Sequence, residues 1–135
     1  MIAYQIEKNI TSKEFRDLLV RSTLGERRPI DDLERLKIMI ENANLILTAR
    51  EKGKLVGIAR AITDFVYCTY LSDLAVDLDY QKRGIGKDLI RRVKIETPNA
   101  NLILLAAPKA VDYYSHIGME KHDACYLLQD LKNLR

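Results

Sequence analysis

Two glycines, Gly84 and Gly86, lie between a run of residues typical of a strand and a run typical of a helix. We expect the strand over residues 70–76, and a helix that begins at Ile85 and ends before Pro98. The first N–H groups of a helix have no acceptor within it, and the helix dipole adds positive charge there. Since glycine has no Cβ, a bulky phosphate can approach the backbone. This turn therefore predicts a site for a ligand that carries phosphate.

Basic side chains flank the same turn. We interpret Lys82, Arg83 and Lys87 as groups that attract phosphate. The net charge of the whole chain is only +3, which is too small to indicate a nucleic-acid partner. A basic nucleic-acid binder is therefore retained only as an alternative, whose affinity would have to depend on salt.

Bulk properties limit the class of protein further. The 135 residues predict one domain over 1–135, with neither a membrane-spanning run nor a signal-peptide pattern, so we expect a cytoplasmic protein without a membrane partner. We expect Cys68 and Cys125 to be reduced thiols. With two histidines and no CxxC pair, no metal site is expected.

Hydrophobic periodicity predicts an alternation of strands and helices. Thr11 to Glu14 has the spacing of a capping box, and the segment Asp31–Glu34 is expected to cap a second helix. A short helix after Pro108 is expected to be closed by Gly118. Strands are expected over 4–8, 45–49, 55–62, 70–76, 102–106 and 126–128. The predicted order is β-α-α-β-β-β-α-β-α-β.

Two common phosphate-binding motifs do not fit the glycine turn. A Walker loop needs four residues between its glycines and Ser or Thr after its lysine, but here one residue separates the glycines and Asp88 follows Lys87. A dinucleotide fingerprint needs a third glycine where Leu89 stands. The remaining interpretation is a pyrophosphate loop of the form Arg/Gln-x-x-Gly-x-Gly/Ala, which runs from Gln81 to Gly86.

With this motif the chain resembles the GNAT superfamily of acetyl-CoA-dependent N-acetyltransferases. The resemblance rests on Asp73–Lys87 and on a tyrosine segment, Ala110–Met119, and it is strong over about residues 70–120. It implies an α+β (α/β) fold in a single domain, with a mixed central sheet of six to seven strands flanked by about four helices. It also implies acetyl-CoA as co-substrate, a primary amine as acceptor and direct attack in a ternary complex.

The resemblance assigns the cofactor contacts residue by residue. The pantetheine arm would lie along the backbone of the strand before the loop, and one N–H there would polarise the thioester carbonyl. The amides of the loop would surround the pyrophosphate. The residues so assigned are Leu74, Ala75, Val76, Gln81, Lys82, Arg83, Gly84, Ile85, Gly86, Lys87 and Tyr114.

The resemblance also implies a tyrosine that protonates the departing CoA thiolate, and Tyr114 takes that position. The competing interpretation makes it a core aromatic. For the base, strand alternation places Tyr70, Ser72 and Leu74 on one face and Asp73 on the other, unless a bulge changes the parity. Asp73 is the candidate base. The alternatives are that Asp73 has a structural role, or that a water relay takes the proton of the amine.

The sequence leaves the acceptor open. In the family, the region that corresponds to about residues 24–42 would select the acceptor. Acidic and basic residues are mixed there, and no pattern favours one kind of amine. Small molecules, polyamines, antibiotics and protein amines therefore all remain possible. A non-catalytic acyl-CoA-binding regulatory module is the alternative function. A homodimer is expected if a second subunit covers the edge formed by Tyr126–Leu128.

Overall fold

The computed structural model describes all residues of the chain, 1–135. They form two compact units, Met1–Leu105 and Ala106–Arg135, which we describe separately. Four α-helices are present, as expected. No helix of the chain has both the length and the apolar character that crossing a membrane would require. The expectation of one domain over residues 1–135 stays a prediction.

The first unit is built on a five-stranded mixed sheet in the order β1-β2-β3-β4-β5. The first four strands pair antiparallel, and β5 pairs parallel to β4. The strands are β1 (Ala3–Ile6), β2 (Leu45–Glu51), β3 (Lys54–Thr63), β4 (Cys68–Val76) and β5 (Asn101–Ile103).

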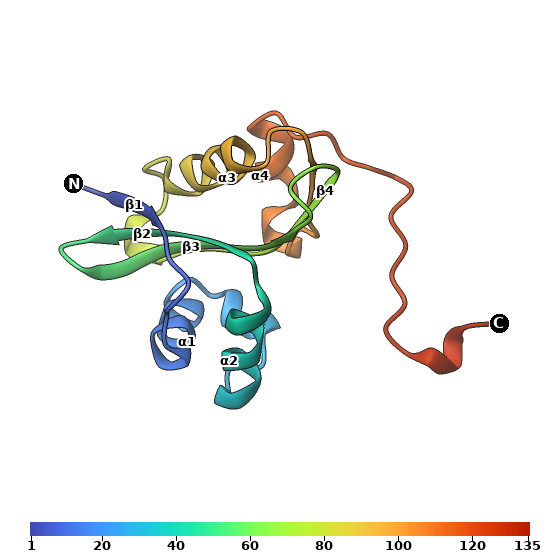
Figure 1. Cartoon of the computed structure of the whole chain (residues 1–135), viewed down its shortest axis with the longest axis horizontal. Helices are drawn as coiled ribbons and strands as arrows, with labels where there is room; N and C mark the ends of the chain where they lie inside the picture. Colours follow the sequence, from blue (N-terminus) through green and yellow to red (C-terminus); the bar gives the residue numbers. More distant parts are fainter. The chain divides into compact units, whose positions relative to one another are not determined.

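Helices cover both faces of this sheet. Helices α1 (Ser12–Arg21) and α2 (Leu33–Asn42) lie on one face, and α3 (Ile85–Glu96) lies on the other (Figure 1). The predicted caps are confirmed, because the Thr11 side chain accepts from the Glu14 amide at 3.1 Å. Asp32 likewise accepts from the amide of Arg35 at 3.0 Å.

The core explains this arrangement of layers. On the first face, buried residues of α1 and α2 such as Phe15 and Leu36 pack with Ile58 and Ala75 of the sheet. On the other face α3 approaches the sheet closely at Gly57, where a Cβ would lie 3.2 Å from Leu89 Cδ1. The first turn of α3, which begins at Ile85, is thereby packed against β3.

One β-bulge changes the faces of β4. Arg60 pairs with Asp73 but Ala61 pairs with Leu71, so Ser72 is an extra residue in β4. Ile62 then pairs with Tyr70. Because opposite residues share a face, and Arg60 and Ile62 share one, Tyr70 lies on the face of Asp73. The expectation from simple alternation, that Tyr70 shares a face with Leu74, is wrong.

The sheet also has fewer strands than expected. It contains five strands rather than six to seven. Residues 126–128 form no strand and their side chains are exposed. The strand expected over 102–106 is only β5, Asn101–Ile103. A short apolar run becomes a strand only where a neighbouring strand completes its hydrogen bonds, and the run itself does not encode that partner. The homodimer, which was argued from an edge at residues 126–128, stays a prediction without that support.

The second unit contains α4 (Val111–His116), preceded by a 3-10 turn at Pro108–Ala110 and followed by another at Leu131–Asn133. Helix α4 ends as the sequence predicts. Gly118 has a φ of +102°, and the amide of Met119 donates to the Tyr114 carbonyl at 3.0 Å. This is a Schellman closure with glycine in the left-handed conformation.

Candidate functional site

The turn between β4 and α3 carries a row of unused backbone donors. The amides of residues 82–87 donate to no acceptor within the protein, and the first amide with one is that of Asp88, which bonds Gly84 at 3.0 Å. All these residues except Ile85 are at least partly exposed. The turn therefore offers a continuous set of N–H groups at the positive end of α3, which suits an anion.

The backbone of this turn has the conformation of an anion-binding nest. Lys82 and Gly84 both have positive φ, at +65° and +81°. Alternation of left- and right-handed residues turns successive N–H groups toward one concave surface. A Cβ at Gly84 would meet nothing within 4 Å. The space beside this glycine is therefore open.

The side chain of Asp77 holds the start of the β4–α3 turn in place. Its side chain is almost fully buried, accepts from the Asp79 amide at 2.9 Å, and pairs with Arg21 at 2.8 Å. Lys54 lies 3.7 Å from the same carboxylate oxygen. Burial alone would raise the pKa of Asp77, but the Asp79 amide and the two cations outweigh it and lower that pKa. The anchor is therefore a charged carboxylate at neutral pH.

The side chains predicted to attract phosphate differ in their placement. Arg83 lies over the Tyr80 ring, 4.8 Å from its centroid, and donates to the Asp79 carbonyl at 3.2 Å. Gln81 Nε2 donates to the Val76 carbonyl at 3.1 Å. Lys82 and Lys87 make no hydrogen bond or ion pair within the protein and are exposed. The two lysines are thus the available cations at this turn.

Strand β4 leaves much of one edge unpaired. Its pairing with β5 covers only Cys68, Thr69 and Tyr70, whereas its pairing with β3 continues to Val76. From Leu71 onward the β5 side of β4 has no partner strand. Leu74, Ala75 and Val76 therefore lie on a free strand edge that leads directly to the turn. Such an edge can pair with an extended ligand through its backbone.

Asp73 lies in a buried ionic cluster. It is 0% exposed, and Arg28 Nε lies 2.5 Å from its Oδ1 while Arg60 Nε pairs with its Oδ2. Arg28 also donates to the Ser72 carbonyl at 2.8 Å, and Arg60 donates to Ser72 Oγ at 2.9 Å. Both carboxylate oxygens of Asp73 are thus engaged by guanidinium groups. This environment suits a structural carboxylate better than a proton acceptor.

Tyr114 lies in α4 of the second unit. Its ring packs edge-to-face with that of Tyr113, with centroids 5.3 Å apart. Burial, and to a lesser extent Tyr113, raises the pKa of Tyr114 above its usual value. The phenol thus keeps its proton throughout the neutral range, as a general acid must.

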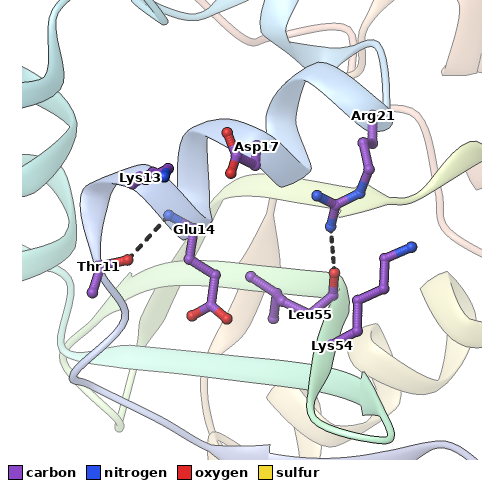
Figure 2. Close-up of a pocket in the computed structure, with 7 residues that line it drawn as sticks. All are labelled: Thr11, Lys13, Glu14, Asp17, Arg21, Lys54 and Leu55. Carbon is purple, nitrogen blue, oxygen red and sulfur yellow. Dashed lines mark hydrogen bonds between the residues drawn. The ribbon is translucent and has the colours of Figure 1, made fainter.

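A pocket of about 360 Å³ opens elsewhere in the first unit, between α1 and the start of β3 (Figure 2). Its lining is Thr11, Lys13, Glu14, Asp17, Arg21, Lys54 and Leu55. Arg21 donates from this pocket to the Leu55 carbonyl at 2.6 Å. None of these residues was predicted as a site residue. The pocket is connected to the β4–α3 turn through the pairs that Arg21 and Lys54 make with Asp77, and through Lys54, which lies over the Tyr80 ring.

Sequence reasoning missed Arg21, Arg28 and Arg60. Each contacts its carboxylate from a distant part of the chain, so no local motif contains the pair. One signal was present, because Asp73 lies within a mostly apolar run that predicts a strand. A buried carboxylate requires cationic or hydrogen-bonding partners.

The family of the chain follows from comparison with known proteins. A sequence model described as "Acetyltransferase (GNAT) domain" matches residues 25–127. An uncharacterized N-acetyltransferase ycf52 of Gracilaria tenuistipitata var. liui is 33% identical over 100 residues, which are 68% of this chain and 53% of that protein. The GCN5-related N-acetyltransferase 2, chloroplastic, of Arabidopsis thaliana is 34% identical over 74 residues, 53% of this chain and 29% of that protein. The match thus spans about half, or less, of these relatives.

Solved structures share the fold. A GNAT-family acetyltransferase from Streptococcus pneumoniae superposes with a TM-score of 0.80 at 21% identity, covering 96% of this chain and 98% of its own. The aminoglycoside N-acetyltransferase AAC(6')-Iy, solved in complex with CoA, gives 0.73 at 17% identity, covering 97% and 95%. At such identities the likeness establishes the architecture, and the family match over residues 25–127 establishes descent. The chain belongs to the GNAT family of acetyltransferases.

Proposed function

We propose that this chain transfers an acetyl group from acetyl-CoA to a primary amine by direct attack within a ternary complex. The observation that carries the proposal is the row of unused amides at residues 82–87, which continues the free edge of β4. Family membership and the N-acetyltransferase names of the relatives support the reaction class. The complex of AAC(6')-Iy with CoA supports the donor.

The residues present fit such a donor. The amides of residues 82–87 would bind the pyrophosphate, and Lys82 and Lys87 would add charge without first breaking an ion pair. The edge of Leu74, Ala75 and Val76 would pair with the pantetheine arm. These contacts would place the thioester beside β4, where a backbone N–H can stabilise negative charge on its carbonyl oxygen.

The chemistry then requires a proton to leave the amine and another to reach the thiolate. Holding the two reactants in line supplies much of the acceleration. Tyr114 is proposed to protonate the thiolate, because its raised pKa keeps the phenol protonated. In this proposal Asp73 is structural, because both of its oxygens accept from arginines, and the proton of the amine leaves through water.

One observation keeps a second function open. The only carboxylate within β4 is engaged by Arg28 and Arg60, so this strand presents no free base. A protein that binds acyl-CoA without turnover would have the same turn and the same free edge. This regulatory module is the alternative to the transferase.

Two measurements separate these functions. Calorimetric titration with acetyl-CoA tests the donor, and release of CoA thiol against a panel of primary amines tests turnover. Gly86→Glu should abolish acetyl-CoA binding, because the new carboxylate enters the seat of the pyrophosphate. Unchanged affinity of that variant would refute the assignment of the turn. Tight binding with no amine-dependent thiol release across the panel would favour the module.

A further inference from the structure

The cluster around Asp73 contains more positive than negative charge. Two guanidinium groups, of Arg28 and Arg60, share the single carboxylate of Asp73, and neither pairs with a second acid. The Arg60 side chain is 6% exposed and Asp73 is 0% exposed. An excess charge in such a place is costly unless an anion compensates it. The cluster is therefore one negative charge short.

Arg28 is the member of the cluster that a ligand can reach. Its side chain is 20% exposed. It uses three N–H groups, to Asp73, to the Ser72 carbonyl and to the Arg27 carbonyl. A guanidinium has five N–H groups in one plane, so Arg28 keeps donors for a further acceptor. Two parallel N–H groups are the geometry that a carboxylate prefers.

The position of Arg28 connects this charge with the proposed reaction. It binds the carbonyl of Ser72, the bulged residue, which lies just beyond the last β4 residue paired with β5. On the same face an apolar row crosses three strands, because Ile62 pairs with Tyr70 and Tyr70 pairs with Ile103. All three side chains are at least 39% exposed. A cation and an apolar surface thus lie on one face, where the free edge of β4 begins.

We propose that this face binds the acceptor and that Arg28 binds a carboxylate of the acceptor. The acceptor is then a small primary amine that carries a carboxylate at the end of an apolar linker. The inference rests on the proposed function. A polycationic acceptor such as a polyamine is disfavoured at this face, because it would meet the uncompensated charge of the two arginines.

The test uses three probes of matched length that differ at one end: ε-aminohexanoate, ε-aminohexanamide and hexamethylenediamine. Each is titrated into the full-length protein with and without saturating CoA, which binds without turnover. The acid should bind about ten-fold tighter than the amide and the diamine, the scale of one charge-assisted hydrogen bond. Arg28→Gln should bring the three affinities within about two-fold of one another. That variant should fold, because Asp73 keeps its pair with Arg60. Arg27→Gln, at the neighbouring exposed arginine, is the matched control and should keep the preference.

Equal affinities in the parent protein, tighter binding of the diamine, or a preference that survives Arg28→Gln would each overturn the inference, as would undetectable binding of the acid. A blocked lysyl-glutamate dipeptide that binds tighter than ε-aminohexanoate would overturn the small-molecule assignment. Thiol release from acetyl-CoA is measured in parallel. Turnover without a preference for the acid would support the proposed transferase function and refute the acceptor site at Arg28. Arg28-dependent binding of the acid without turnover of any amine would support the site and refute the transferase function.

Discussion

Arg21 Nε lies 2.8 Å from Asp77 Oδ2, so the last residue of α1 is paired with the residue that follows β4. Arg21 also donates to the Leu55 carbonyl at the start of β3. The turn that presents the free amides is therefore braced by a helix on the opposite face of the sheet. Its shape depends on residues more than fifty positions away in the sequence.

We expect Asp77→Ala to weaken both the fold and the donor site. The change removes the acceptor of the Asp79 amide and the partner of Arg21, and it should lower the free energy of unfolding by about 1–3 kcal/mol. Acetyl-CoA affinity should fall with it, because the turn loses its anchor. Urea unfolding and calorimetry measure the two effects. Asp31→Ala, at an exposed acid, is the control, and equal effects of both variants would contradict the role of Asp77.

Gly84 and Gly53 offer a matched pair of substitutions. Both have positive φ, +81° and +82°, and a Cβ would meet nothing within 4 Å at either. Alanine at either position should cost a similar amount of stability, about 1 kcal/mol, because a left-handed residue is strained. Only Gly84→Ala should weaken acetyl-CoA binding, since its methyl group occupies space open to the ligand. Equal acetyl-CoA affinities of the two variants, measured by calorimetry, would show that Gly84 does not line the acetyl-CoA site.

Tyr114→Phe should lower turnover by about 10²-fold, the scale of general acid catalysis, with little change in acetyl-CoA affinity. Tyr113→Phe is the neighbouring control and should keep most of the activity. Because the pKa of Tyr114 is raised above its usual value, the parent enzyme should lose no turnover to ionisation of this phenol across the neutral pH range. A kcat profile over this range checks that expectation. Full activity of Tyr114→Phe would assign the residue to packing.

Glu7 should contribute to stability in a way that depends on pH. Burial alone would raise the pKa of this carboxyl group, but hydrogen bonds from Arg50 and Thr48 outweigh it and lower the pKa to about 2. A depressed pKa in the folded state stabilises the protein above the unfolded pKa of about 4.3, and this contribution is lost as pH falls toward 2. Glu7→Gln should therefore be less stable than the parent at pH 7, and the difference should shrink at pH 3.

Chemical denaturation at both pH values measures this change. The sign is decisive: a destabilisation by Glu7→Gln that grows toward low pH would contradict the depressed pKa. The exposed Glu26→Gln serves as the control and should be neutral at both pH values.

The parts of the fold that local sequence encodes were predicted well. Thr11 and Asp32 cap helices because their side chains satisfy amides three residues away. Gly118 closes α4 because glycine tolerates the left-handed conformation at low cost. The strand, glycine turn and helix around Gly84 follow from composition and periodicity alone. In each case the interacting groups lie within a few residues, so a single segment contains the signal.

The rest depends on contacts between distant segments. The bulge at Ser72 reflects the register of β3 against β4, and no residue type in β4 marks it. The pairs of Asp73 with Arg28 and Arg60 span 45 and 13 positions, so spacing could not identify them. Residues 126–128 are apolar but form no strand. Hydrophobic periodicity predicted six strands and the family resemblance implied six to seven, and the five-stranded sheet departs from both.

The divergence of β5 from β4 has a consequence for the protein without its ligand. A strand edge without a partner strand is the usual template for intermolecular β-pairing, and β4 has no β5 partner from Leu71 to Val76, although side chains bind the carbonyls of Ser72 and Val76. An acyl carrier bound along this edge would block that pairing. If acetyl-CoA is the donor, as proposed, its binding would then also protect the protein from aggregation, and the apoprotein should self-associate more readily than the complex.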